Sequence, residues 1–192
     1  MIDARPLYFV TTSNWKYRQG KEFLERHGIS LEQATTELPE SRSEDVLEVA
    51  KGKAAFAYEQ LRKPVIIIDG AFHIKALNGF PKTFVKFAEK YIGASGVIKL
   101  MEGMSERSYE WPNVLVYRDD KVEKHFVGYI HGQIVENIPS GLQGNAFSLI
   151  QLPNGYDKTF AQMTKRELRH FETNVWQPAL FSTFAKWYSL TK

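Results

Sequence analysis

A polar and basic turn follows the first apolar segment of the chain and has the side chains needed to bind phosphate. Residues 7–12 are apolar or β-branched, which is typical of a buried strand. The turn carries hydrogen-bonding side chains and cations, namely Thr12, Ser13, Asn14, Lys16 and Arg18. Ligands of open α/β sheets bind beyond the carboxyl ends of strands, and N–H groups at a helix start favour an anion. An ordinary polar helix cap with solvated charges explains the same residues, and the missing glycines exclude a Walker loop.

Two carboxylates are candidates for binding a divalent cation. Asp69 ends the run Val65–Ile68, which is apolar at every position and predicts a strand buried on both faces. A carboxylate there must face a cleft, a partner or a cation, because burying it alone is costly. Glu40 lies just ahead of a predicted helix start. Mg²⁺ prefers carboxylate and phosphate oxygens together, and a carboxylate can also position or deprotonate a water. A turn aspartate and a glutamate favoured by the helix dipole are the alternatives.

A loop containing glycine and proline at residues 77–82 leads into another predicted helix. Lys82 or Lys86 would lie near the start of that helix, in a position suited to phosphate, and solvated lysines are the alternative. The five histidines show no spacing typical of metal ligands. No Ser-His-Asp order or nucleophile elbow is present either, so these residue types indicate no second kind of catalytic site.

Composition limits the class of protein. The chain has 192 residues, 43% of them hydrophobic, which fits one domain with a sizeable core. The absence of cysteine excludes disulfides, thiol nucleophiles and zinc–thiolate sites. The net charge of +3 comes without a clustered basic stripe, so we expect no nucleic-acid partner. Residues 1–6 lack a signal-peptide core and no apolar run approaches the ~20 residues of a membrane span, so we expect a cytoplasmic protein without a membrane partner.

Helical and strand patterns alternate early in the chain, and a strand-rich stretch follows. This order predicts an α/β fold with a mixed sheet flanked by helices. The expected elements are a strand at 7–12; a helix ending near Gly28; a helix behind a capping box at 41–44; a strand at 65–68; two short helices between Phe84 and Met101, broken at Gly93; strands at 114–117 and 125–135 joined by a turn at 118–121; a capping box at 164–167; and a last helix with Pro178 at its first position.

Taken in order, several segments resemble one family, the inosine triphosphate pyrophosphatases (the Ham1, or non-canonical purine nucleoside triphosphate pyrophosphatase, family). The matching segments, which cover most of the chain, are Phe9–Asn14, Glu37–Glu40, Pro64–Asp69, Ala76–Pro81, Phe126–Ile134 and Pro153–Met163. The last segment and the Gly-Phe-Pro of the loop are the most specific. The resemblance implies a long mixed twisted sheet flanked by helices, with two lobes and a central cleft, in a single domain over residues 1–192.

The resemblance also implies an activity and roles for individual residues. The family hydrolyses nucleoside triphosphates to the monophosphate and pyrophosphate with Mg²⁺, usually as a homodimer. Glu40 and Asp69 would be the catalytic residues, serving the magnesium ion and the attacking water. The substrate-binding residues would be Thr12, Ser13, Asn14, Lys16, Arg18, Lys86, Phe147, Ser148 and Lys165. Asn14 and a nearby cation would hold phosphate, Lys86 would reach the triphosphate, and Phe147 would stack on the base.

Several positions depart from the family pattern. Ile68 replaces the first acid of an acidic pair, Gly70 replaces a hydroxyl residue, and Tyr17 stands where the lysine of the phosphate turn is expected. The departures in the purine-contacting part are Ser148 for aspartate, Leu168 for lysine and residues 172–174 for Ser-His-Arg. A pocket that loses hydrogen-bonding groups loses discrimination. We therefore expect a divergent nucleoside triphosphate pyrophosphatase with altered base specificity. The alternatives are a non-catalytic nucleotide-binding or regulatory protein on the same fold, and a phosphohydrolase acting on another nucleotide.

Overall fold

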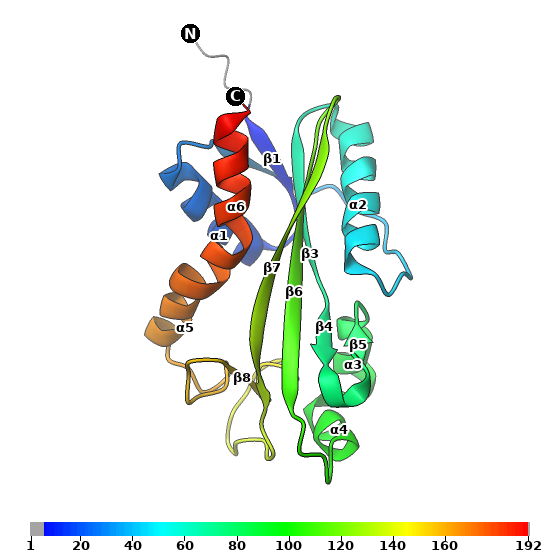
Figure 1. Ribbon diagram of the computed structural model, residues 1–192, viewed down its shortest axis with the longest axis vertical. Helices are drawn as coiled ribbons and strands as arrows, with labels where there is room; N and C mark the ends of the chain where they lie inside the picture. Colours follow the sequence, from blue (N-terminus) through cyan, green and yellow to red (C-terminus); the bar gives the residue numbers. More distant parts are fainter. Residues whose placement is uncertain (1–5, 192) are drawn as a thin grey trace. The chain divides into compact units, whose positions relative to one another are not determined.

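The computed structural model describes residues 6–191, which form a mixed eight-stranded sheet flanked by helices (Figure 1). The elements are β1 (Leu7–Val10), α1 (Asn14–Arg26), β2 (Leu31–Ala34), α2 (Val46–Leu61), β3 (Val65–Gly70), β4 (Phe72–Ile74), a 3-10 turn (Lys75–Leu77), β5 (Pro81–Lys82), α3 (Val85–Tyr91), α4 (Gly93–Leu100), β6 (Ser108–Arg118), β7 (Glu123–Ile134), β8 (Gln151–Pro153), α5 (Lys165–Phe171), a π-helical turn (Glu172–Trp176) and α6 (Gln177–Leu190). The predicted α/β class, with a mixed sheet flanked by helices, is therefore confirmed, whereas the two lobes with a central cleft stay a prediction.

The sheet combines parallel and antiparallel pairs. Its strand order is β2-β1-β3-β6-β4-β5, and β7 pairs with β6 and with β8. Strand β1 runs parallel to β2 and β3, whereas β4 is antiparallel to β5 and β6. The chain divides into two compact units. Unit 1 comprises the residues up to 69, residues 113–128 and the residues from 174 onward, and unit 2 comprises residues 70–112 and 129–173. The prediction of one domain over residues 1–192 stays a prediction.

Unit 1 has helices on both sides of its part of the sheet. Helices α1 and α6 pack together on one side, and α2 lies on the other (Figure 1). Residues 65–68 of β3 are all buried, as their unbroken apolar run predicted. The apolar face of α6 supplies Phe181 and Phe184 to the core, and Phe181 packs on Phe23 of α1 with ring centroids 5.8 Å apart. This double cover explains why β3 needs no polar face.

The helix ends follow local side-chain chemistry, with one prediction wrong. Gly28, with φ of +73°, follows α1 as predicted. The capping box predicted at residues 41–44 does not form, because α2 begins later and Asp45 caps it by accepting the N–H of Leu47 at 2.8 Å. The hydroxyl of Ser43 instead accepts the N–H of Asp45 at 3.1 Å. Residues 41–44 thus form turns that compete with a helix start.

Strand β6 extends beyond both ends of the strand predicted at residues 114–117. Strand β7 begins before the predicted residue 125 and ends at Ile134, just short of the predicted residue 135, and the turn between the strands is as predicted. The start of β6 at Ser108 is not evident from the sequence, because polar side chains and a proline interrupt its apolar pattern. In β7, exposed and buried positions alternate over its whole second part. In the turn, the Asp119 carboxylate accepts the N–H groups of Lys121 and Val122 at 2.8 and 2.7 Å. Gly128 of β7 faces α6 so closely that a Cβ atom would meet backbone atoms of Ala179.

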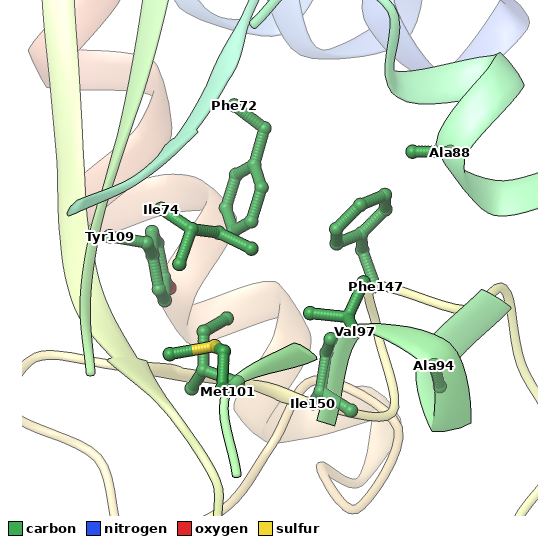
Figure 2. Close-up of a cluster of buried hydrophobic side chains, with 10 residues drawn as sticks. Phe72, Ile74, Ala88, Ala94, Val97, Met101, Tyr109, Phe147 and Ile150 are labelled. Atoms are coloured by element: carbon green, nitrogen blue, oxygen red, sulfur yellow. The ribbon is translucent and has the colours of Figure 1, made fainter. Parts of the chain in front are cut away.

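Unit 2 has its own apolar core (Figure 2). Ten buried side chains from β4, α3, α4 and its C-cap, β6, β7 and the segment before β8 form it: Phe72, Ile74, Ala88, Ala94, Val97, Met101, Tyr109, Ile134, Phe147 and Ile150. The two short helices predicted between residues 84 and 101 are confirmed as α3 and α4, with a positive φ of +67° at Gly93. The core thus joins the α3–α4 pair to the sheet of this unit.

The C-terminal helices combine one confirmed and one corrected prediction. The capping box of α5 is present, with Thr164 and Glu167 exchanging hydrogen bonds. Pro178 is the second residue of α6 rather than the first, and a π-helical turn precedes the helix. Proline cannot donate the α-helical bond to the carbonyl four residues earlier, which fits a wider turn there. Among residues 6–191, no helix combines the length and apolarity needed to cross a bilayer. Residues 1–5, on which the signal-peptide prediction partly rests, lie outside this range.

Candidate functional site

The predicted phosphate turn forms a regular helix start at the carboxyl end of β1. Ser13 caps α1, since its hydroxyl accepts the N–H of Lys16 at 3.2 Å. Its own N–H donates to the Thr11 hydroxyl at 3.1 Å, which tightens the turn. Thr12, Asn14 and Arg18 are exposed, so their polar groups are accessible beside the first turn of α1. The turn therefore presents N–H groups and hydroxyls where an anion is favoured.

Lys16 connects this turn with the end of β3. Its Nζ donates a hydrogen bond of 3.1 Å to the Ile68 carbonyl, in the residue directly before Asp69. The neighbouring Tyr17 points elsewhere, because its hydroxyl donates to the Leu31 carbonyl in β2 at 3.2 Å. Lys16 is therefore the cation of the turn that lies beside the predicted catalytic carboxylate.

The two predicted carboxylates meet at one ammonium group. Lys53 of α2 donates to Oδ2 of Asp69 at 2.6 Å and to Oε2 of Glu40 at 3.4 Å. The Asp69 and Lys53 side chains are 22% and 13% exposed, whereas Glu40 is 72% exposed, so the stronger contact is also the better shielded one. Burial alone would lower the pKa of Lys53, but its hydrogen bond to Asp69 and the charges of both carboxylates raise the pKa above its usual value. Lys53 is thus a cation at neutral pH.

The sequence predictions missed Lys53, although the chain contains a signal for it. The buried face of α2 is formed by Val46, Val49, Ala50, Ala54 and Ala57. Lys53 lies three to four residues from Val49, Ala50 and Ala57, and therefore on the same face. A lysine on a buried helix face must have a counter-charge, because a buried unpaired charge is costly. That argument predicts an acidic partner for Lys53, but it does not identify which one.

The carboxylate pair fits a divalent cation that shares its coordination with a ligand. Within residues 6–191, no three His, Asp or Glu side chains gather as a complete protein-made metal site. Glu40 and Asp69 offer hard carboxylate oxygens, and the Glu40 side chain is exposed. Mg²⁺ is often bound by only one or two carboxylates, with phosphates and waters completing its octahedron. The donor set is therefore compatible with Mg²⁺ carried by a phosphorylated ligand.

The other predicted substrate residues belong to unit 2. Lys86 is exposed at the second residue of α3, and Lys165 is exposed at the first residue of α5. The loop before α3 is tight, as predicted, with positive φ at Asn78 and Gly79. Ser148 is held locally: its N–H donates to Oδ1 of Asn145 at 2.7 Å and its hydroxyl to the Asn145 carbonyl at 2.8 Å.

Phe147 requires a correction. Its side chain is only 4% exposed and lies in the core of unit 2, where its ring centroid is 4.9 Å from that of Phe72 (Figure 2). A ring that packs on other core side chains offers no free face to a nucleobase. Phe147 is a core residue, and the expectation that it stacks on a base is wrong for this structure.

The sheet and the turns at its strand ends define an open α/β protein, a class whose ligands bind beyond the carboxyl ends of the strands. Comparison with known proteins identifies the family within this class. The model of the Ham1 family matches residues 7–173, and the chain belongs to this family. The resemblance found in the sequence is therefore confirmed.

Two relatives match over nearly their full length. The "dITP/XTP pyrophosphatase" of Saccharolobus solfataricus is 32% identical over 180 residues, which cover 94% of this chain and 93% of the relative. The protein of the same name from Methanopyrus kandleri is 34% identical over 181 residues, covering 94% of each chain. Among solved structures, a HAM1 protein from Coxiella burnetii matches with a TM-score of 0.80 at 18% identity, covering 96% of this chain and 98% of that one. The Staphylococcus aureus Ham1 protein matches with 0.77 at 19% identity, covering 97% and 100%. At these identities the two structures show the shared fold.

Proposed function

We propose that the chain is a nucleoside triphosphate pyrophosphatase that releases the monophosphate and pyrophosphate with the help of Mg²⁺. Family membership and two relatives named dITP/XTP pyrophosphatase support this proposal. The observation that carries it is the meeting of Glu40 and Asp69 at Lys53, next to the carbonyl that Lys16 binds. Triphosphate hydrolysis requires charge neutralisation and an oriented water, and this group of side chains can supply both.

The residues of unit 1 divide the chemical tasks between them. The α1 turn and Lys16 bind phosphate oxygens, and Lys16 exchanges its neutral carbonyl acceptor for a charged one, which strengthens the bond. Glu40 and Asp69 would hold Mg²⁺, which neutralises the phosphate charge when it is bound. Asp69 orients a water and accepts its proton. The water oxygen bonds to phosphorus, the bond between the α- and β-phosphates breaks, and pyrophosphate leaves.

We also propose that the base preference differs from that of the family. An aspartate at position 148 would only accept hydrogen bonds, whereas Ser148 donates its hydroxyl to a neighbouring carbonyl. Phe147 is part of the core, so base contacts must come from other side chains. The Glu-Thr-Asn at residues 172–174 changes both charge and shape compared with Ser-His-Arg. The substitutions at position 148 and at residues 172–174 alter groups that would distinguish one purine edge from another.

The test is pyrophosphate release from a panel of standard and deaminated nucleoside triphosphates, with Mg²⁺ or Mn²⁺. Asp69→Asn should lower the rate by at least about 10²-fold, the usual contribution of a positioned acid or base. Asp120→Asn, in the exposed turn after β6, is the matched control and should keep full activity. Binding by calorimetry without turnover would instead favour the non-catalytic alternative, and orthophosphate in the ³¹P NMR spectrum would favour another phosphohydrolase.

We further propose that the protein works as a homodimer in the cytoplasm, as the family resemblance implies. Helix α3 offers an exposed aromatic pair, since Phe87 and Tyr91 are 63% and 69% exposed with their rings stacked at 6.2 Å. Exposed apolar groups of this kind are typical of a surface that a partner covers. Light scattering coupled to size exclusion measures the mass directly, and a monomer at micromolar concentration would contradict this part of the proposal.

A further inference from the structure

We propose that Lys53 occupies the place of the divalent cation until nucleotide arrives, so that the nucleotide-free protein binds the metal only weakly. Metal and triphosphate would then enter together. The inference rests on the proposed function for the metal at Glu40 and Asp69 and for the identity of the nucleotide. The competition between Lys53 and a metal ion is a property of the carboxylate pair itself.

The geometry places the ammonium between the two carboxylates. Its Nζ lies 2.6 Å from Oδ2 of Asp69 and 3.4 Å from Oε2 of Glu40. A magnesium ion bound to the same two oxygens would lie about 2.0–2.1 Å from each of them, and therefore in nearly the same space as the ammonium. Two cations cannot share this space, so a metal ion must displace Lys53 from at least one carboxylate.

The backbone of α2 holds Lys53 in this position. The helix is fixed by residues on the same face as Lys53, since Val49, Ala50 and Ala57 are buried. The Lys53 side chain is only 13% exposed, so the surrounding protein leaves its ammonium few positions other than the one beside the two carboxylates. The α2 helix thus presents a fixed positive charge to the pair, whereas an exposed surface lysine would move away at little cost.

The charge balance explains why nucleotide changes the outcome. The ammonium of Lys53 reduces the charge of the carboxylate pair from −2 to −1, and the nearby cation Lys16 weakens it further, so the pair attracts a divalent cation far less than it would without Lys53. A triphosphate adds several negative charges and provides new acceptors for the displaced ammonium. It also supplies the remaining oxygen ligands that Mg²⁺ needs. Metal affinity should therefore be low without nucleotide and much higher with it.

The experiment measures Mn²⁺ binding to the nucleotide-free protein by electron paramagnetic resonance, in which only free Mn²⁺ gives the sharp signal. Lys53→Met should bind Mn²⁺ at least about tenfold more tightly than the natural chain, because the metal no longer has to break a charged hydrogen bond of Lys53. Lys51→Met is the matched control. Lys51 lies on the same helix, and its partner is Glu123 at 3.8 Å, so its loss should leave Mn²⁺ affinity unchanged. Lys53→Arg keeps the positive charge and should also bind weakly.

Two further variants separate the possible outcomes. Lys53→Gln removes the charge but keeps a donor, and it should bind more tightly even if the methionine variant folds poorly. Adding Asp69→Asn to Lys53→Met should abolish the gained affinity, which locates the metal at the pair. The proposal is overturned if neither charge-removing variant binds Mn²⁺ more tightly, or if the gain survives Asp69→Asn. None of these measurements depends on catalytic turnover. The Mn²⁺ result therefore tests this proposal even if no nucleoside triphosphate of the panel is hydrolysed.

Discussion

Gly128 lies at the closest approach of β7 to α6, and replacing it by alanine tests the packing of unit 1. An added Cβ atom would meet the carbonyl of Ala179, with the carbonyl carbon at 2.7 Å, and would lie 3.1 Å from the backbone nitrogen of Leu180. These atoms belong to a helix backbone and cannot rotate away, so β7 or α6 must shift. Overpacking of this kind costs about 1–3 kcal/mol. For a chain of this size the melting temperature should fall by roughly 2–12 °C.

The assay is thermal and urea unfolding followed by circular dichroism. Gly52→Ala is the matched control, because Gly52 lies inside α2 and an added Cβ atom there has no neighbour within 4 Å. Alanine is better than glycine in a helix by about 0.5–1 kcal/mol, so this variant should melt roughly 1–4 °C higher. If Gly128→Ala is as stable as the natural chain, the close approach of β7 and α6 is incorrect.

Three other outcomes are expected. Lys16→Met should raise KM for the triphosphate about tenfold or more, because a charged hydrogen bond to phosphate is lost, and steady-state kinetics would show it. The hydrogen bond from Lys158, with those from the α5 cap, lowers the pKa of Glu167 to about 2. The ionised Glu167 therefore stabilises the fold above about pH 4.5, and this stabilisation is lost as the pH falls toward 2. Urea unfolding of Glu167→Gln should accordingly show a smaller loss of unfolding free energy between these pH values than the natural chain shows. Phe184→Ala should cost about 3–5 kcal/mol, since the side chain is fully buried, whereas Leu190→Ala, 79% exposed, should change stability by less than about 0.5 kcal/mol.

Local features of the fold could be predicted from the sequence because their causes are local. The strand at β3 follows from an unbroken apolar run, and the end of α1 follows from a glycine with positive φ at residue 28. The start of α2 could not be chosen in the same way. Ser41, Ser43 and Asp45 are all good helix caps, and they differ by less than the packing energy that decides among them.

The candidate site could be predicted only in part. Its acidic residues are found from their place after strands and beside a helix start, but their common partner depends on which turn of α2 faces the end of β3. That relation between elements is set by tertiary packing, which no short motif contains. The error at Phe147 is of another kind. Its position in a family motif indicated that the ring contacts the ligand, whereas the surrounding core buries the ring.

The division of unit 1 into three separated stretches of chain has a consequence for biosynthesis. Helix α6 follows every other described element in sequence, yet it packs against α1, which is made near the beginning. The emerging polypeptide therefore carries the uncovered apolar side of α1 while most of the protein is being translated. Exposed apolar surface on nascent chains is prone to aggregate and is a target for chaperones. Completion of this half of the molecule must await release of its last helix from the ribosome.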